Sequence, residues 1–110
     1  MRFFANIGLS IVVTAGCALA DTVISASRES IAEFRIGYSY ERGQGMAKDY
    51  AEAMRHYLIA AAEGNPVAEF RIGYLYEKGL GVSPDPVLAR QWYAKAASHG
   101  DDHAQRKLDQ

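Results

Sequence analysis

The chain has 110 residues, 49% of them hydrophobic, 23% charged and 11% aromatic, and its formal net charge is −1. This composition is that of one ordinary globular domain, and three prolines with ten glycines exclude a collagen-like or Pro/Gly-rich disordered chain. The near-neutral charge argues against nucleic-acid binding driven by counterion release and against a polybasic membrane-surface protein. The single cysteine, Cys17, cannot form an internal disulfide or supply a zinc site by itself.

The first twenty residues have the pattern of a secretory signal peptide. A positive start at Arg2 precedes an uncharged segment that ends in the small residues Ala18 and Ala20. We expect cleavage after Ala20, which makes the mature protein exported, either periplasmic or secreted. The segment is too short, and too diluted by polar residues and glycines, to be a membrane span, so we expect no integral span after processing.

A lipoprotein signal is the alternative for the same segment. The run from Thr14 to Cys17 resembles a bacterial lipobox, in which the cysteine is lipidated and becomes the new N-terminus. Such motifs usually have leucine three residues before the cysteine, and Thr14 departs from that pattern. Soluble export with Asp21 as the first residue is therefore favoured over a lipid anchor at Cys17.

The rest of the chain repeats itself with a period of 36 residues. Residues 32–38 recur without change at 68–74, and a third copy begins at Ala104 but stops almost at once. A fixed period in this range is the signature of a solenoid. The predicted organisation is a signal peptide at 1–20, a flank at 21–31, repeats at 32–67 and 68–103, and a partial third repeat or C-terminal cap at 104–110.

Each period predicts two helices, and no segment shows the period-two alternation of a strand, so the expected fold class is all-α. The first helix of the second copy should have Asn65 as its N-cap and Pro66 in its first turn. In the first copy, Asp49 and Glu52 resemble a capping box at the start of the second helix. The repeating structural residues are the mid-helix glycines Gly37 and Gly73, the loop glycines Gly43, Gly45, Gly79 and Gly81, the caps Asp49 and Asp85, and the helix-ending glycines Gly64 and Gly100.

The repeated pattern is Ala-x-x-x-x-Gly-x-x-Tyr-x-x-Gly-x-Gly-x-x-x-Asp-x-x-x-Ala-x-x-x-Tyr-x-x-Ala-Ala-x-x-Gly, present at 32–64 and again at 68–100. It resembles the Sel1-like repeat. The resemblance implies a tetratricopeptide-like α/α solenoid, whose usual role is scaffolding or adaptor binding, often in the bacterial periplasm. Trp92 stands where the family commonly has tryptophan in its second helix, and its first-repeat counterpart is His56.

Positions that do not repeat are where a solenoid can encode partner selectivity without disturbing the stack. Tyr50, His56, Arg90 and Trp92 are such positions, and aromatic residues and arginine are typical interface anchors. These four residues are the candidates for partner binding. We expect an exported, non-enzymatic interaction module or adaptor whose partner is another protein and not a nucleic acid, with self-association also open.

The residues give no catalytic, cofactor-binding or metal constellation. The Gly-x-Gly turns lack the preceding strand that a nucleotide fingerprint requires. His99 and His103 are four apart, but Gly100 interrupts the helix between them, which argues against a metal site. Two alternatives remain: a penicillin-interacting hydrolase, implied by cysteine-rich members of the resembled family whose cysteines are missing here, and a short stub that functions only in a larger assembly, since solenoids generally need about three repeats.

Overall fold

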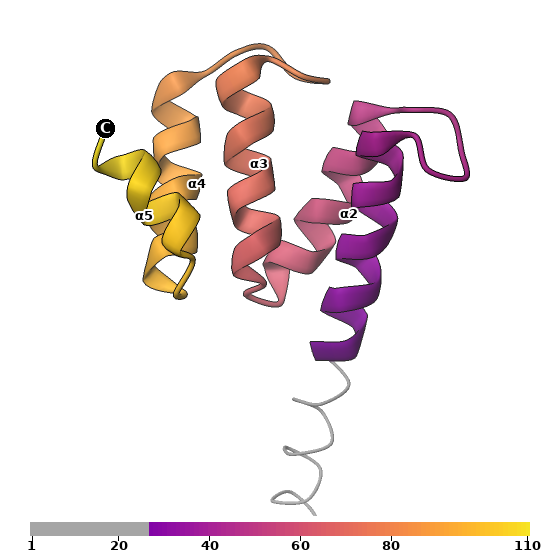
Figure 1. The fold of residues 1–110 in the computed structure, drawn as a ribbon, viewed down its shortest axis with the longest axis horizontal. Helices are drawn as coiled ribbons and strands as arrows, with labels where there is room; N and C mark the ends of the chain where they lie inside the picture. The colour runs from indigo at the N-terminus through magenta and orange to yellow at the C-terminus, as the bar shows by residue number, and fades with distance from the viewer. Residues whose placement is uncertain (1–26) are drawn as a thin grey trace, which may run out of the picture.

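A computed structural model describes residues 27–110, so the predicted signal peptide, Cys17 and the flank up to residue 26 lie outside the described part. The described part begins with a helix over residues 27–42, here called the N-terminal helix. No strand occurs among residues 27–110. The helices that follow are α2 (Tyr50–Ala62), α3 (Pro66–Lys78), α4 (Pro86–Ser98) and α5 (Asp102–Leu108). They stand side by side in chain order, each antiparallel to the one before it (Figure 1). The fold is therefore an all-α solenoid of two helical hairpins, and α5 begins the next hairpin.

Local capping sets where the helices begin and end. The Asn65 side chain accepts hydrogen bonds from the backbone N–H groups of Val67 and Ala68, at 3.0 and 3.1 Å, and Pro66 occupies the first turn of α3. The same helix ends at Gly79, whose φ of +69° is a left-handed conformation that favours glycine. These contacts lie within a few residues of each helix end, and for this reason the helix limits follow the sequence closely.

The capping box expected at Asp49 and Glu52 forms only in half. Asp49 Oδ1 accepts from the Glu52 N–H at 3.0 Å, as the box requires. The Asp49 N–H, which should meet the Glu52 carboxylate, instead donates to the carbonyl of Tyr40 at 3.0 Å. The loop folds back onto the preceding helix and occupies this donor, and in the second repeat Asp85 donates to the carbonyl of Tyr76 in the same way, at 2.9 Å.

A buried tyrosine packed on a glycine joins the two helices of each hairpin. The ring of Tyr57 lies against Gly37, and the ring of Tyr93 lies against Gly73; a Cβ atom added at these glycines would stand 2.8 and 2.7 Å from ring carbons. Both tyrosines are almost fully buried. Glycine in a helix interior costs about 1 kcal/mol relative to alanine. The close helix approach that it permits here accounts for its position.

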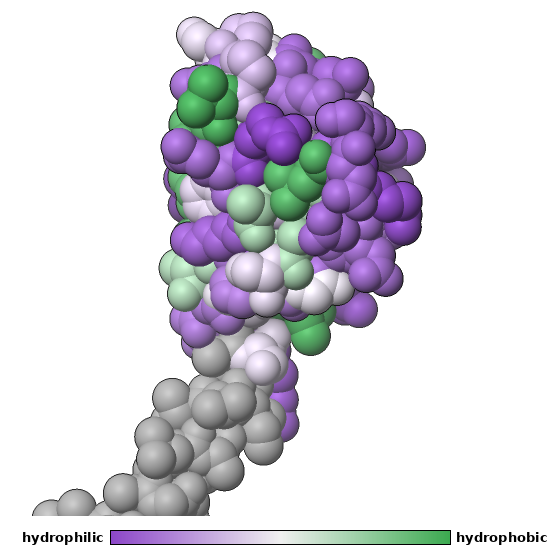
Figure 2. All heavy atoms as spheres, turned by 90° about the vertical axis from the view of Figure 1, so that its left-hand side faces the viewer, coloured by the Kyte–Doolittle hydropathy of each residue, from purple (hydrophilic) through white to green (hydrophobic). Residues whose placement is uncertain are grey.

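The C-terminal end of the described stack is covered by α5. Its Ala104 is fully buried against α4, while Asp102, His103, Gln105 and Arg106 are exposed. Viewed from this end, the surface is mostly hydrophilic, with hydrophobic residues scattered among polar ones (Figure 2). Within residues 27–110, no helix combines the length and the apolar character needed to cross a membrane.

Candidate partner-binding groove

An open groove of about 550 Å³ runs across the first helices of successive repeats. It receives side chains from the N-terminal helix, the loop after it, the start of α2, from α3 and its following loop, and from α5. We call it the central groove. Its lining residues are Glu41, Arg42, Lys48, Tyr50, Phe70, Arg71, Tyr74, Leu80 and Lys107.

The base of the groove is a polar network centred on Glu41, which is only 5% exposed. The Tyr57 hydroxyl donates to Glu41 Oε1 at 2.6 Å, and the Arg71 guanidinium pairs with both carboxylate oxygens. Burial lowers the pKa of Arg71 and raises the pKa of Tyr57. The buried carboxylate is thus held by donors from α2 and α3, as burial of a charge requires.

The same network recurs one period later around Glu77. The Tyr93 hydroxyl donates to Glu77 Oε1 at 2.5 Å, and Lys107 Nζ lies 3.1 Å from the same oxygen. These residues stand 36 positions after those around Glu41, with lysine in place of arginine. Bonds from Tyr93 and Lys107 lower the pKa of Glu77, while burial, together with the bond to that carboxylate, raises the pKa of Tyr93. A carboxylate–tyrosine–cation unit therefore links each hairpin to the first helix of the next.

Cationic side chains in the groove lie over aromatic rings. The Arg71 guanidinium is 4.7 Å from the centre of the Tyr74 ring and 5.9 Å from that of Tyr38. Arg42 lies 5.8 Å over Tyr38, and Lys48 Nζ lies 5.6 Å over Tyr50. Such contacts restrain long side chains without neutralising their charge. Tyr50, one of the four candidates from the sequence, is therefore part of the groove.

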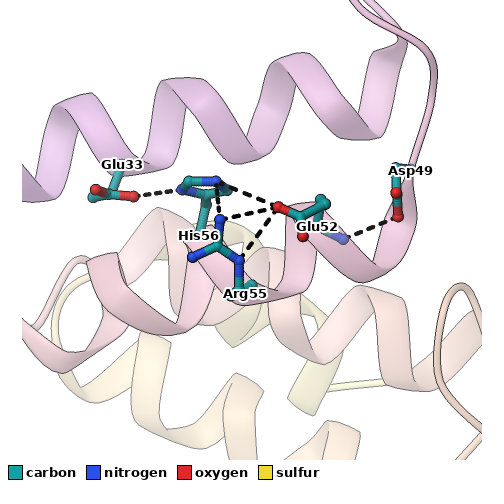
Figure 3. Close-up of polar contacts among 5 residues, drawn as sticks. All are labelled: Glu33, Asp49, Glu52, Arg55 and His56. Carbon is teal, nitrogen blue, oxygen red and sulfur yellow. Dashed lines mark hydrogen bonds and ion pairs between the residues drawn. The ribbon is translucent and has the colours of Figure 1, made fainter.

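His56, the second candidate, lies between helices and is bonded on both ring nitrogens (Figure 3). Its Nδ1 is 2.6 Å from the Glu33 carboxylate and its Nε2 is 3.1 Å from Arg55 Nη2, while the ring stacks on Tyr40. Since an arginine nitrogen can only donate and a carboxylate only accept, Nε2 faces a donor and Nδ1 faces an acceptor. The side chain is 12% exposed, and its visible role is to join α2 to the N-terminal helix.

Trp92 occupies the position of His56 in the second repeat. The glutamate that corresponds to Glu33 therefore has a different partner there. Glu69, the counterpart of Glu33, is fully buried, and His99 Nδ1 reaches it from the end of α4 at 2.8 Å. His103 is separate from this pair, with its Nδ1 3.9 Å from Asp101. In the part of the chain that the structure describes, no group of three or more His, Cys, Asp or Glu is placed to hold a metal ion.

The remaining two candidates lie on other surfaces. Arg90 donates to the carbonyl of Leu108 at 3.2 Å, at the end of α5. Trp92 is half-buried beside Leu88, and Lys95 Nζ lies 5.0 Å from its ring centre. The structure thus places only Tyr50 in the central groove and distributes His56, Arg90 and Trp92 elsewhere. A partner contact at any of the four remains a prediction.

Most residues that line the central groove are not among the four predicted partner-binding residues, because partner selectivity was expected at positions that differ between repeats. Glu41, Phe70, Arg71 and Tyr74 belong to repeating positions, and Lys107 follows Arg71 at the same phase. One feature of the sequence could have indicated the two polar networks. An acidic and a basic residue stand 30 positions apart in both copies, as Glu41 with Arg71 and Glu77 with Lys107, which is the spacing of the two networks.

Antiparallel hairpins in a row, a repeated glycine–tyrosine contact and a groove across the first helices define a helical-repeat protein of the α/α solenoid class. A Sel1 repeat family model matches residues 30–65 and 66–101, which is more than half of the chain. The chain therefore belongs to the Sel1 repeat family. No curated protein is similar enough to the chain to match it.

Three solved structures of similar fold are bacterial proteins. A Sel1 repeat protein from Oxalobacter formigenes is 41% identical, with a TM-score of 0.70 over 73% of this chain and 60% of its own. A protective antigen of uropathogenic Escherichia coli with an SLR fold is 30% identical (TM-score 0.69; 78% and 20% covered), and Helicobacter pylori cysteine rich protein B is 25% identical (TM-score 0.68; 72% and 59%). The chain thus spans less than two thirds of each relative.

Proposed function

We propose that this chain is an exported, non-enzymatic protein–protein interaction module that binds its partner in the central groove. Sel1 repeats commonly mediate such interactions. The observation that supports this site is the groove itself: it gathers aromatic and cationic side chains from both repeats and from α5 on one surface. Aromatic residues and arginine are the types that dominate binding energy at protein interfaces.

Binding in the groove should need little reorganisation of the protein. Arg71 is fixed by Glu41, and Lys107 is fixed by Glu77, so neither side chain has to be ordered when a partner arrives. Ordering a long side chain at an interface costs about 0.5–1.5 kcal/mol. A surface that is restrained in advance avoids much of this cost, which is the physical advantage of a helical stack as an adaptor.

Photo-crosslinking in the cells that naturally produce the protein tests the site. A photoreactive phenylalanine analogue placed at Lys48 or at Leu80, both in the groove, should crosslink the same protein. The same analogue at Val87, which is 68% exposed and lies outside the groove, is the control. Capture of one common protein from both groove positions and not from Val87 supports the proposal. Equal capture from all three positions, or none from the groove, contradicts it.

Export is part of the proposal and has its own test. The pattern of residues 1–20 favours cleavage after Ala20. Fractionation of the producing cells, followed by intact mass measurement, should find a soluble protein that begins at Asp21. A mass that includes lipid on Cys17 would replace the soluble form with an anchored one, and an intact Met1 form in the cytoplasm would contradict export altogether.

No observation favours the hydrolase alternative. The relative whose name describes it as cysteine rich is 25% identical, whereas this chain has a single cysteine, at position 17. A nitrocefin turnover assay on the purified protein is the direct check. The stub alternative is tested by thermal melts across a range of protein concentrations, since an obligate assembly melts at a temperature that depends on concentration.

A further inference from the structure

We propose that the partner segment in the central groove is acidic: an extended peptide whose carboxylates meet Arg42 and Lys48 and whose apolar side chains lie on Phe70, Tyr74 and Leu80. This inference rests on the proposed function and names the chemistry of its ligand. Four lining side chains are cationic, namely Arg42, Lys48, Arg71 and Lys107, and Glu41 supplies the one carboxylate.

The local pairs determine which of these charges are available. Glu41 compensates Arg71, and Glu77 compensates Lys107. The contacts of Arg42 and Lys48 are instead with the ring faces of Tyr38 and Tyr50, and both side chains are exposed. The groove therefore carries an excess of two positive charges at its first-repeat end, on a protein whose overall charge is −1.

The lining of the groove favours a partner segment that carries apolar residues as well as charge. Phe70, Tyr74 and Leu80 offer partly exposed apolar surface beyond the cations. Because the groove is open and extends from Lys48 to Lys107 on α5, its shape suits an extended segment that carries acidic and apolar residues together.

A nucleic acid would be a poor occupant despite its negative charge. Affinity for a nucleic acid comes largely from cations that neutralise its phosphates, whereas the lining of the groove offers two cations, Arg42 and Lys48, that are not already paired with a carboxylate. These charges favour a short acidic peptide over a polyanion.

Fluorescence anisotropy with the mature chain tests the proposal. The probe is a labelled peptide of about ten residues that contains glutamates, one phenylalanine and one leucine. Its controls are the same peptide with lysines for glutamates and a single-stranded oligonucleotide of equal length. We expect the acidic peptide to bind and its affinity to fall as salt rises. No binding of the acidic peptide, equal binding of the lysine peptide, or tighter binding of the oligonucleotide overturns the inference.

A charge-reversal pair locates the binding. The double substitution Arg42→Glu and Lys48→Glu should weaken the acidic peptide at least tenfold. The double substitution Arg28→Glu and Arg35→Glu changes the net charge equally, at exposed positions outside the groove, and should leave affinity within about twofold. Equal weakening by both pairs would show a general charge effect and overturn the assigned site.

Amide chemical shifts give a second measurement that does not depend on a substituted protein. Titration with the acidic peptide should move the resonances of Lys48, Tyr50, Tyr74 and Leu80 most, and shifts confined to other residues contradict the groove. If crosslinking in cells captures a groove partner whose contacting segment is not acidic, this inference fails while the proposed function stands. If no groove partner is captured, the proposed function itself fails.

Discussion

The hydrogen bonds Tyr57–Glu41 and Tyr93–Glu77 are the same contact in the two repeats, but the two glutamates differ in exposure to solvent. Tyr57→Phe and Tyr93→Phe each remove one hydroxyl that donates to a glutamate, at 2.6 and 2.5 Å. The side chain of Glu41 is 6% exposed, but that of Glu77 is 32% exposed. Water can replace the lost donor at Glu77 and has little access to Glu41. The first substitution should therefore destabilise the protein more than the second.

The expected magnitudes follow from this difference in exposure. A hydrogen bond to a charged group contributes about 1.5–3 kcal/mol, and a buried acceptor left unsatisfied bears the full desolvation penalty. We expect Tyr57→Phe to lower the free energy of unfolding by about 2 kcal/mol, because Arg71 remains as a partner of Glu41. For Tyr93→Phe, with Lys107 and water still available to Glu77, we expect about 1 kcal/mol or less.

Urea denaturation followed by circular dichroism at pH 7 measures both values. The slope of the free energy against urea should be the same for the three proteins, which shows that each unfolds to a similar state. Equal losses in the two variants, or a larger loss for Tyr93→Phe, would refute the argument that burial of the glutamate sets the cost.

Two further predictions concern the same units. Gly73→Ala should lower the free energy of unfolding by about 2 kcal/mol. The added Cβ would stand 2.7 Å from the Tyr93 ring and 3.1 Å from the carbonyl of Ala89. The roughly 1 kcal/mol regained in helix propensity does not offset that overlap. The cost in a Tyr93→Leu background, measured by the same denaturation, should be smaller; an unchanged cost would mean that the ring is not the obstacle. Because the pKa values of Tyr57 and Tyr93 are raised in the folded protein, the unfolded chain loses protons above about pH 10 that the folded chain keeps. The free energy of unfolding should therefore fall with rising pH, by up to about 1.4 kcal/mol per pH unit for each group. Denaturation between pH 8 and 11 checks this, and a slope that stays the same in Tyr57→Phe would contradict it.

The helix limits could be predicted because the interactions that set them are local. Asn65 with Pro66 begins α3, Asp85 with Pro86 begins α4, and Gly79 ends α3, all as the residue types indicate. The capping box predicted at Asp49 forms only in half, because its second bond is not decided by local interactions. Its missing half depends on the carbonyl of Tyr40, nine residues away, which reaches the Asp49 N–H only when the loop has folded back.

The fold class, the repeat and the family of this protein could all be predicted from its amino-acid sequence alone. A period of 36 residues needs no coordinates to be seen, and each copy specifies its own two helices through caps, glycines and apolar spacing. It also pointed to residues that differ between copies, and of these only Tyr50 lies in the groove.

Which side chains meet depends instead on how the helices pack in three dimensions. Glu41 and Arg71 are 30 residues apart, and Lys48 and Lys107 come from opposite ends of the described stack, yet all four line one groove. Their convergence depends on how one hairpin rotates against the next, and contacts between hairpins, such as the Arg71–Glu41 pair, hold that arrangement. Residues that repeat in sequence thus form a surface that no single repeat contains.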